Sequence, residues 1–386
     1  MCFAAPFLSE YIPRPSLTTK PDRLRHVRKL RTRLKMCGSK KVENIFERGF
    51  GVNFFLTAVF ILSAPVLGGD LTCASCHPKE AHSQPETSMA HALLLSASNA
   101  AIENRGRLSF RDGAYTYTIE HVDGDDVYTV SDGSTTLSIP IRWTFGLNSP
   151  TYVLEHEGRL YESRVSYYSG INGLDITMGD RTSHPHDIVE AMGRPISDVE
   201  ARACFNCHAT RALSGDRIQF DSLIPGVQCE HCHASASLHA QAISQGKTES
   251  MPKKPGRMEA EEVSTFCGRC HRSFADVMQG SVTGKINVRF QPYRLEKSRC
   301  FDGVDNRISC IGCHDPHREL VRDARAYDPN CLACHGMKGA RAAKSCPVSK
   351  SDCVGCHMPK TELPGSHRTF TDHYIRVVRA NESYPN

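Results

Sequence analysis

Polar and apolar residues alternate along one stretch of the chain, from about Arg107 to Tyr168, as in AYTYTIEHV and TTLSIPIRW. A period of two is typical of strands that bury one face. Asp-Gly or Glu-Gly pairs interrupt the pattern at 112–113, 123–124, 132–133 and 157–158, and such pairs favour tight hairpin turns. We therefore predict an antiparallel β-meander of roughly five or six strands in this stretch.

A second pattern is an apolar run from Val52 to Leu67, preceded by Lys40, Lys41 and Arg48. A basic segment, an apolar segment and small residues after it are typical of a signal peptide. The run includes a proline and is shorter than the roughly 20 residues that span a membrane. We predict that residues 1–69 are a targeting segment; the alternative is an uncleaved membrane anchor. The 35 residues before Met36 are unusual for a signal peptide, and a true start codon further downstream would explain them.

The charge of the chain is uneven. Of 47 basic and 42 acidic residues, residues 1–69 hold 12 and 4, so that 35 basic and 38 acidic residues remain after the targeting segment. The formal net charge of +5 thus arises in the N-terminal segment. The remaining chain has no basic excess that would indicate nucleic-acid binding.

Fourteen of the 18 cysteines form seven CxxC pairs, and a histidine follows each pair directly. Zinc ribbons also use CxxC pairs but do not require that histidine, and a thioredoxin-like site would have one pair. The cysteines are Cys73, Cys76, Cys204, Cys207, Cys229, Cys232, Cys267, Cys270, Cys310, Cys313, Cys331, Cys334, Cys353 and Cys356. The histidines are His77, His208, His233, His271, His314, His335 and His357.

This spacing suits the covalent attachment of haem. Two thiols three residues apart lie on one side of a helical turn, where each can add to one vinyl group of a haem. The histidine that follows is placed to bind the iron. We predict seven molecules of haem c per chain, with these 14 cysteines as attachment residues and the seven histidines as proximal iron ligands.

The other six motifs follow the meander at shorter intervals, in a half of the chain with proline- and glycine-rich loops and no long periodic helix. The predicted fold is a multihaem cytochrome: short helices and irregular segments wrapped on haems, with the meander between the first and second motifs. The predicted divisions are 1–69 for targeting, 70–200 for the first motif and the β-rich region, and 201–386 for six haems.

Several segments resemble the multihaem family named for the tetrahaem cytochrome c of nitrifying bacteria, and are most similar to its larger bacterial members. They are IPGVQCEHCHASASLHA, RFQPYRLEKSRCF, SCIGCHDPH, YDPNCLACH and the C-terminal stretch from Cys346 to Val378. The resemblance implies an exported electron-transfer protein of the periplasm or cell envelope. It does not imply a substrate, because relatives include both carriers and reductases.

The resemblance also implies distal iron ligands. It points to His91, His239 and His317, and the C-terminal pair of His367 and His373 stands in a similar position. For the last two, six residues apart, an extended segment would direct both side chains to the same side. An apolar, strand-like run at Tyr374–Val378 would hold that segment against the haems.

Other histidines and one methionine leave alternatives open. One of His184 and His186 could also serve as a ligand, and Met89 is a rival to His91 because a thioether can bind haem iron. The sequence places His82 and His231 too near their own motifs to be distal ligands. Surface positions are expected for His121 and His156 in the β-rich region.

Cys300 and Cys346 are the cysteines after residue 69 that lie outside the motifs. An oxidising compartment favours a disulfide between them, and two separate thiols are the alternative.

The functional hypothesis is a periplasmic protein that carries electrons between redox partners in the periplasm or membrane. The rival hypothesis is a reductase of a small nitrogen or sulfur oxyanion, which needs one haem with an open axial position. Some such reductases mark that haem with a CxxCK motif, and this sequence has none.

Overall fold

The computed structural model describes residues 73–95, 106–247, 252, 254–280, 282–336 and 344–385. The predicted targeting segment, residues 1–69, lies outside the described residues. The described residues belong to one compact unit. Within them no helix is both long enough and apolar enough to cross a membrane.

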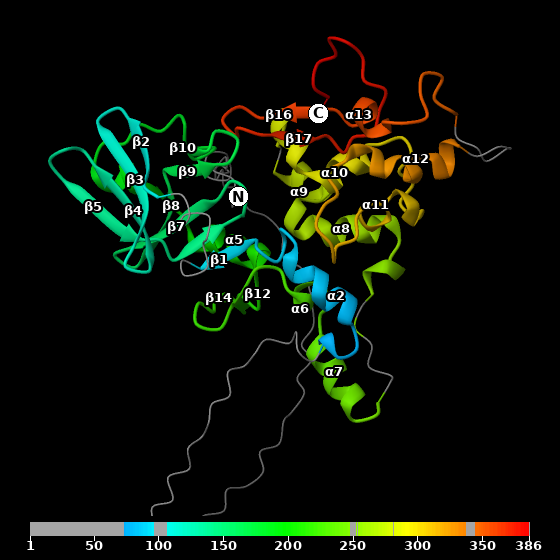
Figure 1. The fold of residues 1–386 in the computed structure, drawn as a ribbon, viewed down its shortest axis with the longest axis horizontal. Coiled ribbons are helices and arrows are strands. Elements are labelled where there is room, and N and C mark those ends of the chain that lie inside the picture. Colours follow the sequence, from blue (N-terminus) through cyan, green and yellow to red (C-terminus); the bar gives the residue numbers. More distant parts are fainter. Residues whose placement is uncertain are drawn as a thin grey trace, which may run out of the picture. The chain divides into compact units, whose positions relative to one another are not determined.

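The first part of the β-rich region is a four-stranded antiparallel sheet in the order of the chain, visible in cyan in Figure 1. Its strands are β2 (Leu108–Asp112), β3 (Tyr115–Val122), β4 (Asp125–Ser131) and β5 (Thr136–Pro140). Asp123 and Gly124 join β3 to β4 with φ angles of 54° and 93°. Positive φ at both turn positions matches the right-handed twist of the flanking strands, which is why Asp-Gly predicts this hairpin.

The other strands of the β-rich region, together with β1 and β11, form a five-stranded antiparallel sheet in the order β1-β6-β7-β8-β11 and a hairpin of β9 and β10. They are β1 (Leu93–Leu95), β6 (Trp143–Phe145), β7 (Thr151–His156), β8 (Arg159–Ser163), β9 (Val165–Tyr168), β10 (Gly173–Ile176) and β11 (Gly193–Pro195). The single predicted meander is thus divided between two sheets and a hairpin. Alternation shows which side chains a strand buries but not which sheet the strand joins.

The two sheets share an apolar core. Tyr117 and Tyr128 from the first sheet lie in one cluster with Tyr152 and Leu154 from the second, and all four are fully buried. Short helix α4 (Ile188–Met192) adds Met192 to the same cluster. The β-rich region therefore has an interior of its own.

The opposite face of the five-stranded sheet packs on helix α5 (Asp198–His208), which carries the second CxxCH motif. Phe205 lies at the centre of this contact, edge-on to Trp143 at 5.4 Å and to Phe145 at 5.2 Å between ring centroids. Because β6 and β7 lie between the first core and this helix, all of β6 and the first four residues of β7 are buried. One haem motif is thus built onto the sheet.

The rest of the described chain consists of short elements. The helices are α2 (Pro78–Ser83), α6 (Cys229–Cys232), α7 (Ala236–Ser244), α8 (Ala260–His271), α9 (Phe274–Gln279), α10 (Gln291–Glu296), α11 (Cys310–Cys313), α12 (Asp328–His335) and α13 (Cys353–His357). The 3₁₀ turns are η2 (Gln84–Glu86), η4 (Pro255–Arg257), η5 (Lys285–Arg289), η6 (Asn306–Ile308) and η7 (Ala324–Tyr327). Two-stranded pairs are β12 (Ala209–Thr210) with β15 (Ile224–Pro225), β13 (Leu213–Ser214) with β14 (Arg217–Ile218), and β16 (Lys360–Glu362) with β17 (Thr369–Thr371).

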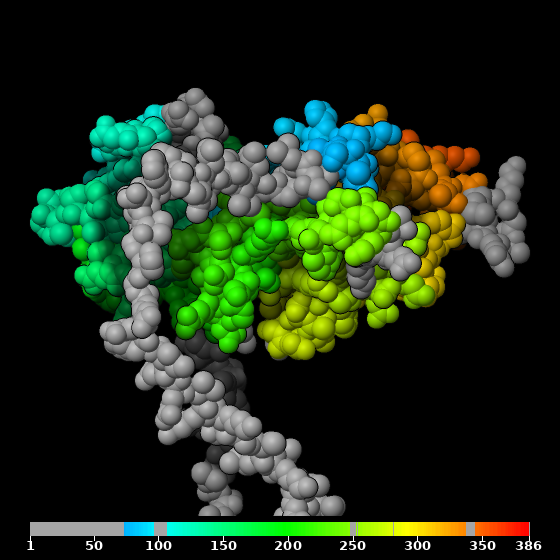
Figure 2. Space-filling view, turned by 90° about the horizontal axis from the view of Figure 1, so that it is seen from below, coloured from blue at the N-terminus to red at the C-terminus, as the bar shows by residue number. Residues whose placement is uncertain are grey.

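Two long-range contacts tie distant parts of the sequence together. The backbone N–H and hydroxyl of Ser88 donate to the carboxylate of Glu319, at 2.6 and 2.8 Å. Figure 2 shows the corresponding blue and orange surfaces next to each other.

The predicted strand at Tyr374–Val378 is not formed; the strand near the C-terminus is β17, a few residues earlier.

Candidate haem-binding site

The seven CxxCH motifs have a common local geometry, set by a single turn of helix. In motifs 1, 3 and 5 the N–H of the histidine donates to the carbonyl of the first cysteine, at 2.7, 2.8 and 2.8 Å for His77, His233 and His314. This bond closes one helical turn, which brings both thiols and the imidazole to one end of a short element. The motif is the last turn of α5, α8 and α12 for motifs 2, 4 and 6, and it makes up the whole of α13 for motif 7.

All 14 motif cysteines and all seven motif histidines line one connected cavity of about 4240 Å³. Ordinary small-molecule pockets occupy about 300–1,000 Å³, so this cavity has room for several groups of cofactor size. Residues of the loops between and after the motifs line it as well, including the largely exposed Leu320, Val348 and Val377. Such apolar side chains around an open volume suit a large apolar ligand.

Neighbouring motifs are in direct contact through their cysteines. The thiols of Cys207 and Cys270 lie close enough to shift each other's pKa, and so do those of Cys267 and Cys310. Cys331 makes a similar contact with Cys353. Motif 4 therefore adjoins motifs 2 and 5, and motif 6 adjoins motif 7.

Three motif imidazoles are oriented by the backbone. The Nδ1 atoms of His208, His335 and His357 lie 2.8 Å from the carbonyl oxygens of Ala92, Lys344 and Arg376 respectively. A carbonyl can only accept, so Nδ1 carries the proton and Nε2 keeps its lone pair for a metal. Metal-binding histidines usually have this arrangement.

Two pairs of imidazoles lie at the separation expected for ligands on opposite sides of one iron. The ring centroids of His233 and His317 are 6.1 Å apart and the rings are parallel within 2°. Those of His314 and His373 are 6.2 Å apart with an angle of 49° between the rings. With metal–nitrogen bonds of about 2 Å and centroids about 1 Å behind the nitrogens, two such ligands would have centroids about 6 Å apart.

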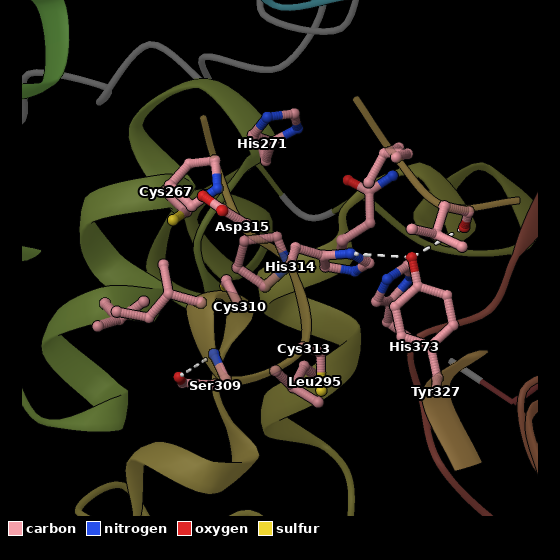
Figure 3. Close-up of a pocket in the computed structure, with 18 of the residues that line it drawn as sticks. Cys267, His271, Leu295, Ser309, Cys310, Cys313, His314, Asp315, Tyr327 and His373 are labelled. Atoms are coloured by element: carbon pink, nitrogen blue, oxygen red, sulfur yellow. Dashed lines mark hydrogen bonds between the residues drawn. The ribbon is translucent and has the colours of Figure 1, made fainter. Parts of the chain in front are cut away.

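Figure 3 shows His314 and His373 side by side, with the Tyr327 hydroxyl 3.4 Å from Nδ1 of His314. His317 lies three residues after His314 of motif 5, yet its ring faces His233 of motif 3 and not His314. The residues present thus fit haem iron with two axial imidazoles at these two places.

Burial lowers the pKa of several cavity imidazoles and so favours their neutral form, which is the form that binds a metal. Burial lowers the pKa of His208 to about 3. Burial, together with the nearby His314, lowers the pKa of His373 to about 4. Burial also lowers the pKa of His271 and His314, and for His271 a hydrogen bond to the side chain of Gln291 opposes the shift.

The other predicted distal ligands have different surroundings. His239 lies on α7 and lines the cavity. The ring of His91 bonds the carbonyl of Thr87 through Nδ1 at 3.0 Å, and this residue is not part of the described cavity lining, whereas its rival Met89 is.

For His367 the structure differs from the expectation. Its Nε2 lies 2.5 Å from Asp175 Oδ2, and its ring packs edge-on to Tyr168, both in the β9–β10 hairpin. The backbone turns at Gly365, with φ of 78°, and His367 itself has φ of 50°. The two histidines are therefore not on one extended segment, and His367 is hydrogen-bonded to Asp175 instead of facing a motif imidazole.

The remaining histidines lie mostly outside the cavity. His82, His184 and His186 are exposed. His121 is bonded to the buried Asp126 at 2.9 Å, and His156 packs on Tyr161. His231 does line the cavity, between the two cysteines of its own motif.

Cys300 and Cys346 are both exposed free cysteines, so the structure does not contain the expected disulfide. In the described part of the chain no three histidine, cysteine or acidic residues gather as a single bare metal ion would require.

The sequence interpretation missed residues that support the site from a distance. Arg294 and Asp372 form a fully buried ion pair next to His373. Asp328 accepts hydrogen bonds from the N–H groups of Asp352 and Cys353, at 2.7 and 2.8 Å, where motif 7 begins. Asp372 precedes a histidine and Asp328 precedes a proline, and neither local sequence indicates which distant residue the carboxylate will contact.

Comparison with known families supports the interpretation of the motifs as haem-attachment sites. The family model described as cytochrome c554 and c-prime matches residues 180–234, which include motifs 2 and 3. A c-type cytochrome, and haem c as its cofactor, are thereby supported; the match covers a small part of the chain and does not single out the tetrahaem cytochrome of nitrifying bacteria.

Comparison with solved structures finds the outer cell wall cytochrome OcwA, at 15% identity and a TM-score of 0.48. The match covers 81% of this chain and 80% of that chain. Comparison with curated proteins finds no match.

Proposed function

We propose that this chain is an exported electron-transfer cytochrome that carries seven covalently bound haems. The observation that carries the proposal is the convergence of all 14 motif cysteines and all seven motif histidines on one cavity. A haem iron takes up and releases one electron without further chemistry by the protein. The role of the chain is then to hold the groups close together and to set the axial ligands of each.

The contacts between motifs favour transfer along a series. Motifs 2, 4 and 5 are linked through Cys207, Cys270, Cys267 and Cys310, and motifs 6 and 7 through Cys331 and Cys353. Groups attached to touching motifs would lie near each other. The second axial ligands that the ring geometry favours are His317 for the haem of motif 3 and His373 for that of motif 5.

Export is part of the proposal. Attachment of haem to CxxCH takes place outside the cytoplasm in the usual bacterial systems, and the apolar run Val52–Leu67 would supply the route. The expected partners are redox proteins of the periplasm or membrane. N-terminal sequencing of the mature protein should give a start near Gly68 to Asp70; a mature chain that keeps Val52–Leu67 and stays in the membrane fraction would instead indicate an anchor.

The haem count is the direct test. A pyridine haemochrome assay together with the intact mass should give seven haems per mature chain. Six or fewer on fully matured protein would contradict the proposal.

One observation favours the reductase as a second candidate. Beside the seven motif histidines, four further histidines line the described cavity, at positions 231, 239, 317 and 373. Not every iron can then receive a second imidazole from the cavity wall, and an iron with an open position can bind a small molecule. Carbon monoxide added to the reduced protein should shift part of the Soret absorption if such a haem exists. An unchanged spectrum would rule out the reductase and leave the electron carrier as the one candidate function.

A further inference from the structure

Arg294, in helix α10, and Asp372, next to His373, form a bidentate ion pair in the interior. Its two hydrogen bonds, Nε to Oδ1 and Nη2 to Oδ2, are both 2.8 Å long, and both side chains are 0% exposed. The third guanidinium nitrogen donates to the carbonyl of Pro385 at 2.7 Å. Burying two charges costs free energy that an apolar pair would not, so such a pair is better suited to fixing an orientation than to stabilising the fold.

The backbone around His373 is fixed on both sides. Asp372 accepts from the N–H of Tyr374 at 3.1 Å. The hydroxyl of Ser298 donates to the carbonyl of His373 at 3.3 Å and accepts from the N–H of Ile375 at 2.8 Å. The imidazole so held stands 6.2 Å from that of His314, centroid to centroid.

The same segment reaches a second motif. Arg376 donates from Nη1 to Asp372 Oδ2 at 2.8 Å. Its carbonyl accepts from Nδ1 of His357 at 2.8 Å, and its N–H donates to the carbonyl of His357 at 3.2 Å. One five-residue segment thus presents an imidazole at motif 5 and orients the imidazole of motif 7.

We propose that the Arg294–Asp372 pair is a positioning device that holds His373 as an axial ligand at motif 5 and, through Arg376, orients the proximal His357 at motif 7. The inference rests on the proposed function, because it requires haem iron at both motifs. Groups that orient a metal-binding histidine tune the metal, so loss of the pair should affect two haems and leave the others as they are.

The test compares purified holoprotein of four variants with the parent. Arg294→Met removes the pair and Arg294→Lys keeps the charge but not the bidentate geometry. His373→Ala removes the ligand itself. Arg164→Met is the matched control, because Arg164 is likewise buried and paired, with Asp112 at 2.8 Å and Asp180 at 3.0 Å, but lies in the β-rich region.

Electron paramagnetic resonance and a redox titration supply the readout. We expect Arg294→Met to lose or alter the same low-spin signal as His373→Ala, and to shift two midpoint potentials. Arg294→Lys should give a smaller change, and Arg164→Met should keep every haem signal of the parent even where it lowers the melting temperature.

The outcomes separate the two proposals. If His373→Ala removes a low-spin haem while Arg294→Met keeps all signals and potentials, the positioning role is overturned and the ligand stands. If His373→Ala has the same spectra as the parent, both the assignment of His373 as an iron ligand and the positioning role of the ion pair are overturned. Should Arg294→Met yield no holoprotein, Arg294→Lys decides, since it keeps the buried charge but not the two parallel hydrogen bonds: a shift at the same haem supports the proposal and unchanged potentials overturn it.

Discussion

The β-rich region and the region of motifs 3–7 have different kinds of interior. In the first, Tyr117, Tyr128, Tyr152 and Leu154 meet in a buried apolar core between two sheets. In the second, the described apolar cluster is small: its buried members are Val288 and Leu363, joined by Met178 from the β-rich region. The short helices surround the cavity that all seven motifs line. Side chains fill the one interior, whereas haem is proposed to fill the other.

This difference bears on how each region becomes stable. A sheet sandwich removes apolar area from water with its own residues. Helices of four to twelve residues are marginal in water and need tertiary packing to persist. The region of motifs 3–7 would obtain that packing from covalently attached groups.

The largest expected effect follows from withholding haem. Protein produced without haem attachment should keep a protease-resistant fragment covering about residues 106–195 and lose resistance across residues 229–385. Limited proteolysis with mass spectrometry of the fragments measures this. Equal resistance of both regions would mean that the helical region has a sufficient core of its own.

A second prediction concerns the joint between the regions at Phe205, which is 0% exposed on α5. Phe205→Ala should lower the free energy of unfolding by about 3–5 kcal/mol, because it leaves a cavity between the sheet and the helix. It should also broaden the signal of the haem at motif 2, since Phe145 packs on both Phe205 and His208.

Val199→Ala is the control on the same helix, because Val199 is 67% exposed. It should stay within about 0.5 kcal/mol of the parent in chemical denaturation. Similar losses for the two variants would show that α5 is not anchored through Phe205.

A smaller effect is expected at the cap of α11. The hydroxyl of Ser309 accepts from the N–H of Gly312 at 3.1 Å, in a residue that is 2% exposed. Ser309→Ala should lower the free energy of unfolding by about 1 kcal/mol. Ser309→Thr should keep most of the stability of the parent, because the threonine hydroxyl can also cap the helix. Thermal unfolding followed at the Soret band compares the three proteins; identical midpoints would rule out a stabilising cap at motif 5.

The smallest effect is expected in a turn of the β-rich region. Gly124 has φ of 93°, so Gly124→Ala should destabilise the sheet by about 1 kcal/mol. Gly256→Ala is the matched control, since Gly256 has neither a positive φ nor an atom within 4 Å of the added methyl group. It should be neutral or slightly stabilising, and a loss equal to that of Gly124→Ala would contradict the role of the turn.

Local chemistry made several features readable from the sequence alone. The CxxCH motifs are complete within five residues, so their thiols and imidazole come together in one turn of helix wherever the motif lies. The Asp-Gly and Glu-Gly pairs likewise mark turns, as at Asp123 and Glu157, because positive φ is a property of the residues themselves. These features do not depend on distant parts of the chain.

Tertiary structure alone decided which distant groups meet. The histidine that faces His233 is His317, from the next motif but one, and the two C-terminal histidines have different neighbours: His314 for His373 and Asp175 for His367. The partner of Arg294 lies 78 residues further along the chain. Such pairings follow from packing between segments that carry no sequence signal for each other, and so does the division of the strands between two sheets.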